Sequence, residues 1–288
     1  MASPRDLRRR IKSIRGTAQI TKAMQMVAAS KMRKAQQAAI NARPFAHQLY
    51  RMQRTATTHS IDFRHPLVEE RPIRQRAVIL IAGDKGLCGA LNTNVFRLAS
   101  KYDTATTRYI TAGRKAAQFV ARSKRRLEAE FAYGDTPTFG EAKAIAVAAR
   151  DLFLTGTVDE VVIIATRFVN TLTQEPVTIE YLPVGEIRGL TVPGVPSEAE
   201  LAAETAQVVF EPKAPELLGY LLRHYLNIYL FVILLNAKAS EQSARMVAMK
   251  NATDNANGLI KDLTLEYNKL RQGNITKELL EIAGGQAG

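Results

Sequence analysis

The residues that could carry out chemistry are few in this sequence. The loop Gly83–Gly89, with the sequence GDKGLCG, follows the apolar run Ala77–Ala82, which is where many α/β proteins bind a phosphate. Its glycines are spaced G-x-x-G-x-x-G, which matches neither the dinucleotide pattern G-x-G-x-x-G nor the phosphate-binding pattern G-x-x-x-x-G-K-[ST]. The spacing therefore favours a tight turn over a phosphate site.

The remaining candidate groups form no catalytic or metal-binding set. Cys88 is the only cysteine, and its place after an apolar run is typical of a buried, inert thiol. The four histidines, His47, His59, His65 and His224, show no metal-ligand spacing. We therefore predict no catalytic residue, no cofactor and no metal. A small nucleotide-using α/β enzyme is the least favoured hypothesis.

The composition indicates a folded protein outside the secretory pathway. Hydrophobic residues make up 46% of the 288 positions, which is ample for a core. A single cysteine cannot form an internal disulfide, and the first residues lack the apolar segment of a secretory signal. The longest apolar run, Ile228–Leu235, is far shorter than the roughly 20 residues that span a bilayer. We expect a reducing, cytoplasmic-side location and no membrane-spanning segment.

The positive charge is concentrated near the N-terminus. The net charge is +13, and residues 1–57 hold thirteen lysines and arginines against one acidic residue, Asp6. Such a segment is a solvated helix face, or it attracts an acidic protein or nucleic acid. The basic residues are spread around the helix without aromatic residues for base stacking, which disfavours nucleic acid. A basic scaffold that binds acidic proteins or nucleic acid stays as the alternative function.

Both ends of the sequence repeat apolar or small residues at alternating spacings of four and three. This heptad period predicts a left-handed coiled coil. We expect one helix over about residues 4–56, begun by Ser3 and Pro4, and another over about 214–283, ended by Gly284. The first set of seam positions is Leu7, Ile11, Ile14, Ala18, Thr21, Gln25, Ala28, Met32, Ala35, Ala39, Ala42, Ala46 and Leu49. The second is Leu221, Tyr225, Ile228, Val232, Leu235, Ala239, Gln242, Met246, Met249, Thr253, Ala256, Ile260, Leu263, Tyr267 and Leu270.

The middle of the chain alternates apolar, strand-like runs with amphipathic, helix-like segments. Such alternation predicts a small, largely parallel, Rossmann-like α/β domain. The expected strands are 77–82, 107–112, 160–165 and 177–182, and the expected helices are 91–102, 114–121 and 139–153. The predicted organisation is an N-terminal shaft helix at 1–57, an α/β domain at 75–211 and a C-terminal shaft helix at 212–288. Because the α/β domain joins the two helices, they must run antiparallel.

The C-terminal helix has two further features, its exposed end and an apolar stretch near its beginning. It is longer than its partner, so its end should extend about 25 Å beyond the first helix. That end carries apolar residues that need another protein to cover them: Leu270, Ile275, Leu279, Leu280 and Ile282. Residues 225–235 are apolar on every face, and they pack either against the α/β domain or against a partner.

Three segments together resemble the gamma subunit of F-type ATP synthases. They are 14–33 (IRGTAQITKAMQMVAASKMR), 83–89 (GDKGLCG) and 240–255 (SEQSARMVAMKNATDN), and the last continues through 267–272 and 275–281. The resemblance covers essentially the full length. It implies a coiled-coil shaft inside a ring of alternating alpha and beta subunits, with one copy per complex. The α/β domain would contact the epsilon subunit and the membrane c-ring.

The resemblance also implies the function and the site. The chain would be a non-catalytic rotor turned by proton flow, peripheral to the cytoplasmic face of the bacterial inner membrane, with the chemistry on the beta subunits. Met24 lies in the stretch that matches the one facing an acidic segment of the beta subunit, although seam packing would also explain it. Five residues match positions that touch beta-subunit loops, and solvated surface residues are the less favoured interpretation: Arg245, Arg271, Gln272, Thr276 and Glu278.

Overall fold

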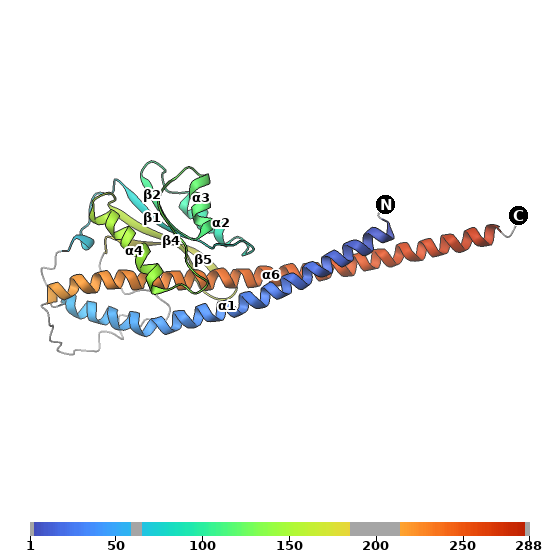
Figure 1. Cartoon of the computed structure of the whole chain (residues 1–288), viewed down its shortest axis with the longest axis horizontal. Coiled ribbons are helices and arrows are strands. Elements are labelled where there is room, and N and C mark those ends of the chain that lie inside the picture. The colour runs from blue at the N-terminus through green and yellow to red at the C-terminus, as the bar shows by residue number, and fades with distance from the viewer. Residues whose placement is uncertain (1–2, 59–64, 185–213, 286–288) are drawn as a thin grey trace. The chain divides into compact units, whose positions relative to one another are not determined.

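The computed structural model describes residues 3–58, 65–184 and 214–285 (Figure 1). Two compact units can be separated, and each is described by itself. One unit comprises Ser30–Ala244 and contains the α/β domain. The other comprises Met1–Ala29 together with Arg245–Gly288 and contains the ends of the two long helices. The long helices are α1 (Pro4–Thr58) and α6 (Ala214–Gly285), within two residues of the predicted bounds.

The α/β domain is built on a five-stranded sheet of order β3-β2-β1-β4-β5. Its first four strands are parallel, and β5 is antiparallel to β4. This topology confirms the predicted α/β class. The strands are β1 (Arg76–Ile81), β2 (Thr107–Ala112), β3 (Arg126–Phe131), β4 (Glu160–Phe168) and β5 (Gln174–Leu182).

Strand β3 was not among the strands predicted from the sequence. It lies at the edge of the sheet and carries the sequence RLEAEF, with exposed Arg126, Leu127, Glu128 and Glu130. Only Ala129 and Phe131 of this edge strand pack against the core, so the strand has no apolar run and the pattern used for the buried strands does not detect it.

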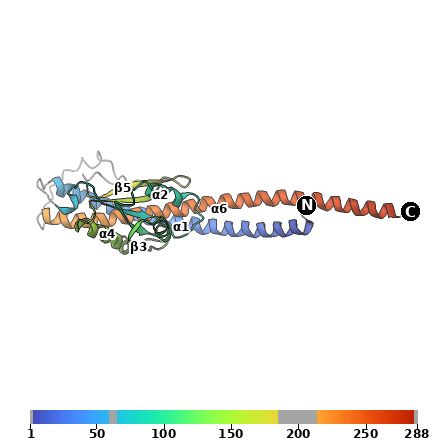
Figure 2. The same ribbon diagram turned by 90° about the horizontal axis from the view of Figure 1, so that it is seen from above.

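Helices cover both faces of the sheet. Helices α2 (Leu91–Ala99) and α3 (Arg114–Arg122) pack on one face, where Val78 and Leu80 meet Val95 and Val120. Helix α4 (Phe139–Leu154) and the first part of α6 pack on the other face. The view from above shows α2 and α4 on opposite sides of the sheet (Figure 2). A short 3-10 helix, η1 (Pro66–Val68), precedes β1 and adds Leu67 to the core.

The apolar stretch of α6 packs against the α/β domain. Leu226 and Leu230 are buried in the same cluster as Ile79 and Ile163 of the sheet. The buried Tyr181 hydroxyl of β5 donates a hydrogen bond to the Leu226 carbonyl at 3.2 Å. This contact settles which of the two sequence-based alternatives holds for residues 225–235. Among the described residues, one helix is long and apolar enough to span a membrane, and 67% of its apolar window is buried in the protein, as in a core helix.

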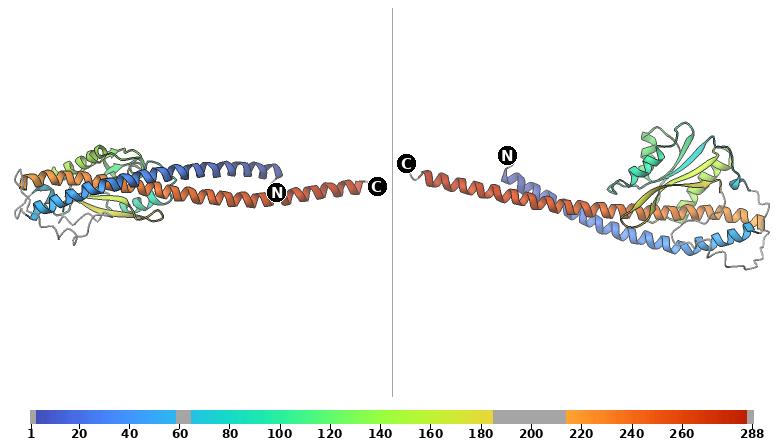
Figure 3. Two further views of the ribbon diagram at one scale, coloured as in Figure 1. Left: turned by 90° about the horizontal axis from the view of Figure 1, so that it is seen from below. Right: turned by 180° about the vertical axis from the view of Figure 1, so that it is seen from behind.

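The two helices of the other unit form an antiparallel pair (Figure 3). Arg8 of α1 donates to the Tyr267 hydroxyl at 2.8 Å, and the Thr21 and Thr253 hydroxyls are 2.7 Å apart. The partner number falls as the α1 number rises, so the pair runs antiparallel as predicted. Apart from Arg245, the buried residues of this pair lie on the predicted seam: Leu7, Ala18, Thr21, Ala28, Met249, Thr253 and Ala256.

Helix α6 extends past the beginning of α1. The Arg8–Tyr267 contact places the first turn of α1 near residue 271 of α6, so the last turns of α6 have no α1 residue opposite them. Ile275, Leu279 and Leu280 in these turns are 48%, 61% and 67% exposed. Ser3 begins α1 as predicted, because its hydroxyl accepts from the Asp6 amide at 3.2 Å.

We predict that the small seam residues are required for the close approach of the helices. Ala28 is 1% exposed, so Ala28→Leu forces three extra carbon atoms into a filled space. We expect this change to reduce the free energy of unfolding by about 1–3 kcal/mol, measured by thermal unfolding of the purified chain. Ala23→Leu, on the exposed face of the same helix, is the matched control. Equal melting temperatures for the two variants would contradict the seam.

Candidate functional site

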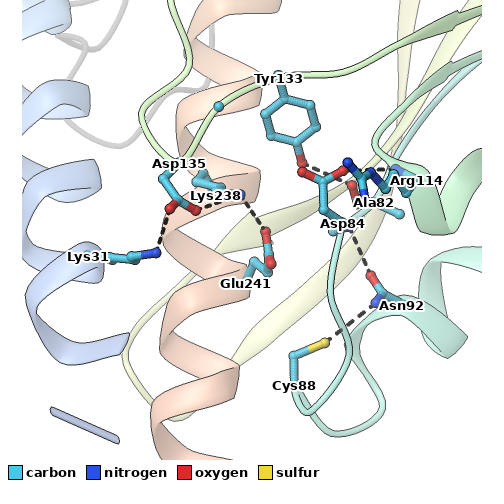
Figure 4. A network of polar contacts seen from close by, with 12 residues as sticks. Lys31, Ala82, Asp84, Cys88, Asn92, Arg114, Tyr133, Asp135, Lys238 and Glu241 are labelled. Carbon is cyan, nitrogen blue, oxygen red and sulfur yellow. Dashed lines mark hydrogen bonds and ion pairs between the residues drawn. The ribbon is translucent and has the colours of Figure 1, made fainter. Parts of the chain in front are cut away.

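The carboxyl edge of the sheet is occupied by helix α6 (Figure 4). In doubly wound α/β proteins this edge is where nucleotides bind. Here the loops after β1, β3 and β4 all contact α6 over Lys238–Ser243, a stretch that is entirely buried. We call the five residues of these loops and of β5 that contact it the collar: Gly83, Tyr133, Asp135, Thr171 and Gln174.

The loop Gly83–Gly89 is a turn that ties β1 to the two following helices. The Gly83 amide donates to Asn92 Oδ1 at 3.1 Å, and Asp84 Oδ1 accepts from the Arg114 amide at 2.9 Å. Gly89 has φ +61°, in the left-handed region that glycine tolerates. Cys88 is buried, as predicted, and its Sγ accepts a long contact from Asn92 Nδ2 at 3.5 Å. These polar groups serve the turn, and the turn supports α6.

Gly83 lets the turn lie directly against α6. A Cβ atom at this position would be 2.8 Å from Cδ of Glu241, so a larger residue would push the buried glutamate aside. Glycine is therefore required here for close approach rather than for phosphate binding.

The collar contains an ionic centre that joins both long helices. Asp135 follows β3, and its Oδ2 lies 2.5 Å from Nζ of Lys31 on α1. Its other oxygen, Oδ1, lies 3.6 Å from Nζ of Lys238 on α6, which in turn is 3.1 Å from Oε2 of Glu241. The hydrogen bond from Lys31 lowers the pKa of Asp135 more than its partial burial raises it, and Lys238 lowers it further. Asp135 is therefore ionised at neutral pH.

Tyr133 connects this centre to the sheet. Its buried hydroxyl donates to the Ala82 carbonyl at 3.0 Å, and the Lys238 ammonium lies 5.1 Å from the centre of its ring. Burial raises the pKa of Tyr133 well above its usual value, and the carboxylates of Glu241 and Asp84 raise it further. The hydroxyl thus stays neutral and keeps its role as a donor.

The loop that presents Asp135 is fixed at its far end by the cap of α4. The Thr138 hydroxyl accepts from the Glu141 amide at 3.3 Å, and Glu141 accepts from the amides of Thr138 and Gly134 at 2.6 and 3.0 Å. This reciprocal arrangement satisfies the orphan amides at the start of the helix. Burial alone would raise the pKa of Glu141, but the hydrogen bonds from Thr138 and Gly134 outweigh it, and the pKa is lowered.

The hairpin between β4 and β5 supplies the third side of the collar. The Ser243 hydroxyl of α6 donates to the Thr171 carbonyl at 2.7 Å, and Gln174 Nε2 lies 3.5 Å from the same hydroxyl. Asn170 shapes the hairpin, because its Oδ1 accepts from the amides of Leu172 and Thr173. The collar therefore holds α6 by polar contacts from the loops after β3 and β4 and by the close approach of Gly83 from the loop after β1.

The residues predicted from the resemblance are not among the collar residues, and they fall into separate groups along the sequence. Arg245 is largely buried, one turn after Glu241, and Met24 is half-buried on α1. Arg271, Gln272 and Thr276 are exposed, about 39 Å along α6 from Arg245. The side chain of Glu278 lies outside the described residues.

The ionic centre was missed from the sequence. Lys238 and Glu241 interrupt a long apolar and small-residue stretch at a spacing of three, which places them on one helix face. That spacing was the available signal, but it does not identify Asp135, more than 100 positions away, as their partner.

The comparisons with known proteins agree over the whole chain. A family model described as ATP synthase matches residues 3–288. The chain is 46% identical to the ATP synthase gamma chain of Opitutus terrae, over 99% of this chain and 98% of that one. It is 43% identical to the ATP synthase gamma chain of Methylacidiphilum infernorum, over 99% of each. The chain belongs to the ATP synthase gamma chain family.

Chains in solved structures of ATP synthases share the fold. A chain from the central stalk and c-ring of the Tetrahymena thermophila mitochondrial ATP synthase matches with a TM-score of 0.60 and 26% identity, over 81% of this chain and 99% of that one. A chain of the Euglena gracilis mitochondrial ATP synthase matches with a TM-score of 0.65 and 19% identity, over 99% and 93%. As a gamma chain, the protein is a non-catalytic stalk subunit, peripheral to the membrane. These matches do not favour the scaffold alternative.

We predict that Gly113 is essential to the carboxyl edge. Its φ of +96° is strained for other residues, and a Cβ atom would lie 2.0 Å from the Ala82 oxygen that accepts from Tyr133. Gly113→Ala should therefore destabilise the chain by about 3 kcal/mol or more, measured by denaturant unfolding. Gly86→Ala, in open space without a positive φ, is the control and should change the stability by less than about 0.5 kcal/mol. Similar losses in both variants would refute this account.

We also predict an acid-dependent contribution from Asp135. Because its folded-state pKa is below the ordinary value of 3.8, the ion pairs stabilise the fold above pH 3.8 and lose their effect as the pH falls further, through the folded-state pKa. The difference in stability between wild type and Asp135→Asn should be less than about 1 kcal/mol at pH 7, since this carboxylate is partly exposed. Urea unfolding of both proteins from pH 7 to below pH 3.8 measures this difference in stability. A difference that grows on acidification would contradict the sign.

Proposed function

We propose that this chain is the central rotor shaft of an F-type ATP synthase. It couples rotation of the membrane c-ring, driven by proton flow, to conformational cycling of the beta-subunit catalytic sites that make ATP. The observation that carries the proposal is the match to the gamma chain family along the whole chain.

The mechanism is a coupling of binding equilibria. Each beta subunit has open and closed states, and a shaft with different faces contacts each site differently. A contact that favours one state over another shifts that site by the difference in contact free energy. Turning the shaft therefore cycles each site through binding, synthesis and release. The chain itself supplies differential contacts and stiffness.

Charge and apolar exposure on the shaft fit a ring around it. Residues 1–57 carry the strong positive charge, which favours the acidic segment of the beta subunits. The exposed end of α6, with Ile275, Leu279 and Leu280, is an apolar surface that requires a protein sleeve. The alternating alpha and beta subunits would provide it.

The α/β domain is proposed to meet the lower part of the rotor. The Tetrahymena relative is described as part of the central stalk and c-ring. By this likeness we assign the α/β domain to contacts with the epsilon subunit and the c-ring, at the cytoplasmic face of the bacterial inner membrane, with one chain per complex.

Within the shaft, six residues are proposed to contact the beta subunits. Thr276, Gln272 and Arg271 are exposed near the end of α6 and are available to a partner. Only a small part of Arg245 is open to one, whereas Met24 is half-exposed. Glu278 completes the set on the basis of the resemblance alone.

The proposal is tested by reconstitution with alpha and beta subunits. Omission of the chain, or removal of residues 270–288, should impair assembly or ATP hydrolysis, because the apolar end of α6 then no longer fills the ring. Hydrolysis and assembly that proceed equally well without the chain would refute the shaft function. Equal activity of the truncated form would refute only the role of the α6 end.

A point substitution tests the predicted interface. Arg271→Ala should weaken binding to the alpha–beta ring by about tenfold or more, equivalent to about 1.4 kcal/mol, measured by titration of labelled chain. Lys101→Ala removes an exposed cation from the α/β domain and serves as the control. If both variants bind as the wild type does, Arg271 is a solvated residue and not an interface residue.

A further inference from the structure

Asp135 contacts both long helices with one carboxylate. Each oxygen faces a different helix: Oδ2 faces Lys31 of α1, and Oδ1 faces Lys238 of α6 (Figure 4). The aspartate itself belongs to neither helix but to the loop between β3 and α4. All three residues lie within the unit Ser30–Ala244. A single side chain of the α/β domain therefore contacts α1 and α6 together.

The α6 half of this link is buried and therefore restrictive. Lys238 is 2% exposed, and an ammonium group in such a place is tolerated only with partners. Its partners are Glu241 at 3.1 Å, Asp135 at 3.6 Å and the ring of Tyr133. Rotation of α6 within the collar would separate the buried charges. The arrangement therefore resists rotation in both directions, which a purely apolar contact does less well because apolar attraction is not directional.

The ion pair between Asp135 and Lys31 of α1 is more exposed, and it therefore restricts the position of α1 less. The side chains of Lys31 and Asp135 are 36% and 54% exposed, so their ion pair contributes little to stability. It is nevertheless a direct tie between the α/β domain and α1. Its expected effect is on the relative position of the helices rather than on the folding of the domain.

We propose that Asp135 is a positioning residue for torque transmission in this chain. It joins the α/β domain to both shaft helices, so that rotation imposed on the domain turns α1 and α6 as one body. This inference rests on the proposed rotor function. The variable that it controls is the coupling between ATP turnover and proton movement rather than the chemistry.

The test uses the complete complex in sealed lipid vesicles, with ATP hydrolysis and ATP-driven proton pumping measured on the same preparation. Asp135→Asn should leave hydrolysis near the wild-type rate and increase uncoupled turnover about fivefold, the factor that a loss of about 1 kcal/mol gives. Asp135→Glu, which keeps the charge, should restore part of the coupling. Asp151→Asn removes an exposed carboxylate on α4 and is the matched control.

A second variant separates positioning from folding. Lys31→Gln removes the other partner of the exposed pair, and the double variant with Asp135→Asn should be no less coupled than Asp135→Asn alone, because both changes remove the same link to α1. If the complex with Asp135→Asn fails to assemble, Lys31→Gln alone tests the proposal. This variant should lower the number of protons pumped per ATP hydrolysed.

Three results would overturn the inference: wild-type coupling in Asp135→Asn, a parallel loss of hydrolysis and pumping at an unchanged ratio, or additive losses in the double variant. Each of these leaves the rotor function intact, provided that the wild-type complex pumps protons. Failure of the rotor function itself would give a different experimental result. A complex without this chain would then pump protons as well as the complete complex does.

Discussion

The burial of α6 in the α/β domain is the contact on which the rest of the structure depends. The same helix is part of the domain core, through residues such as Leu226 and Leu230, and half of the paired helices farther along. Burial of one such side chain contributes about 1.5–3 kcal/mol, whereas a partly exposed ion pair contributes about 1 kcal/mol or less. The apolar contact therefore provides most of the free energy that keeps α6 bound to the α/β domain. It does not by itself determine the rotational setting of the helix.

That setting is determined at the carboxyl edge of the sheet by polar contacts and by one close approach of the backbone. Gly83, Asp135 and Thr171 come from three loops, and each meets a different residue of Lys238–Ser243. A rotated α6 would leave buried donors and charges without partners, and each such group would destabilise the structure by its full desolvation free energy. The edge that binds nucleotides in related topologies is thus used to hold a helix, which explains why the glycine-rich turn matches no phosphate-binding pattern.

The sequence predicted the features that repeat locally and missed those that depend on distant partners. Heptad spacing identified the seam, since residues such as Ala28 and Thr253 report directly that one helix face is buried. Strand β3 was missed because an exposed edge carries no apolar run. The apolar stretch around Leu230 indicated burial but not the surface that it packs against. Asp135 was missed because its role is set by the fold, which brings it to Lys31 and Lys238.

Helix α6 has three kinds of surroundings along its length, and their order suits a transmission element. Between Leu221 and Ser243 most of its residues are buried, many of them in the core of its own α/β domain, so force can enter there. Through Met249, Thr253 and Ala256 it is paired with α1 across small residues, and a close helix pair is stiffer than one helix. Beyond Arg271 the side chains of Ile275, Leu279 and Leu280 are exposed, and another protein is needed to cover them. The helix is buried in its domain in its first part, paired with α1 in its middle part and exposed at its end. Such a helix can transmit rotation from one binding partner to another without any catalytic group of its own.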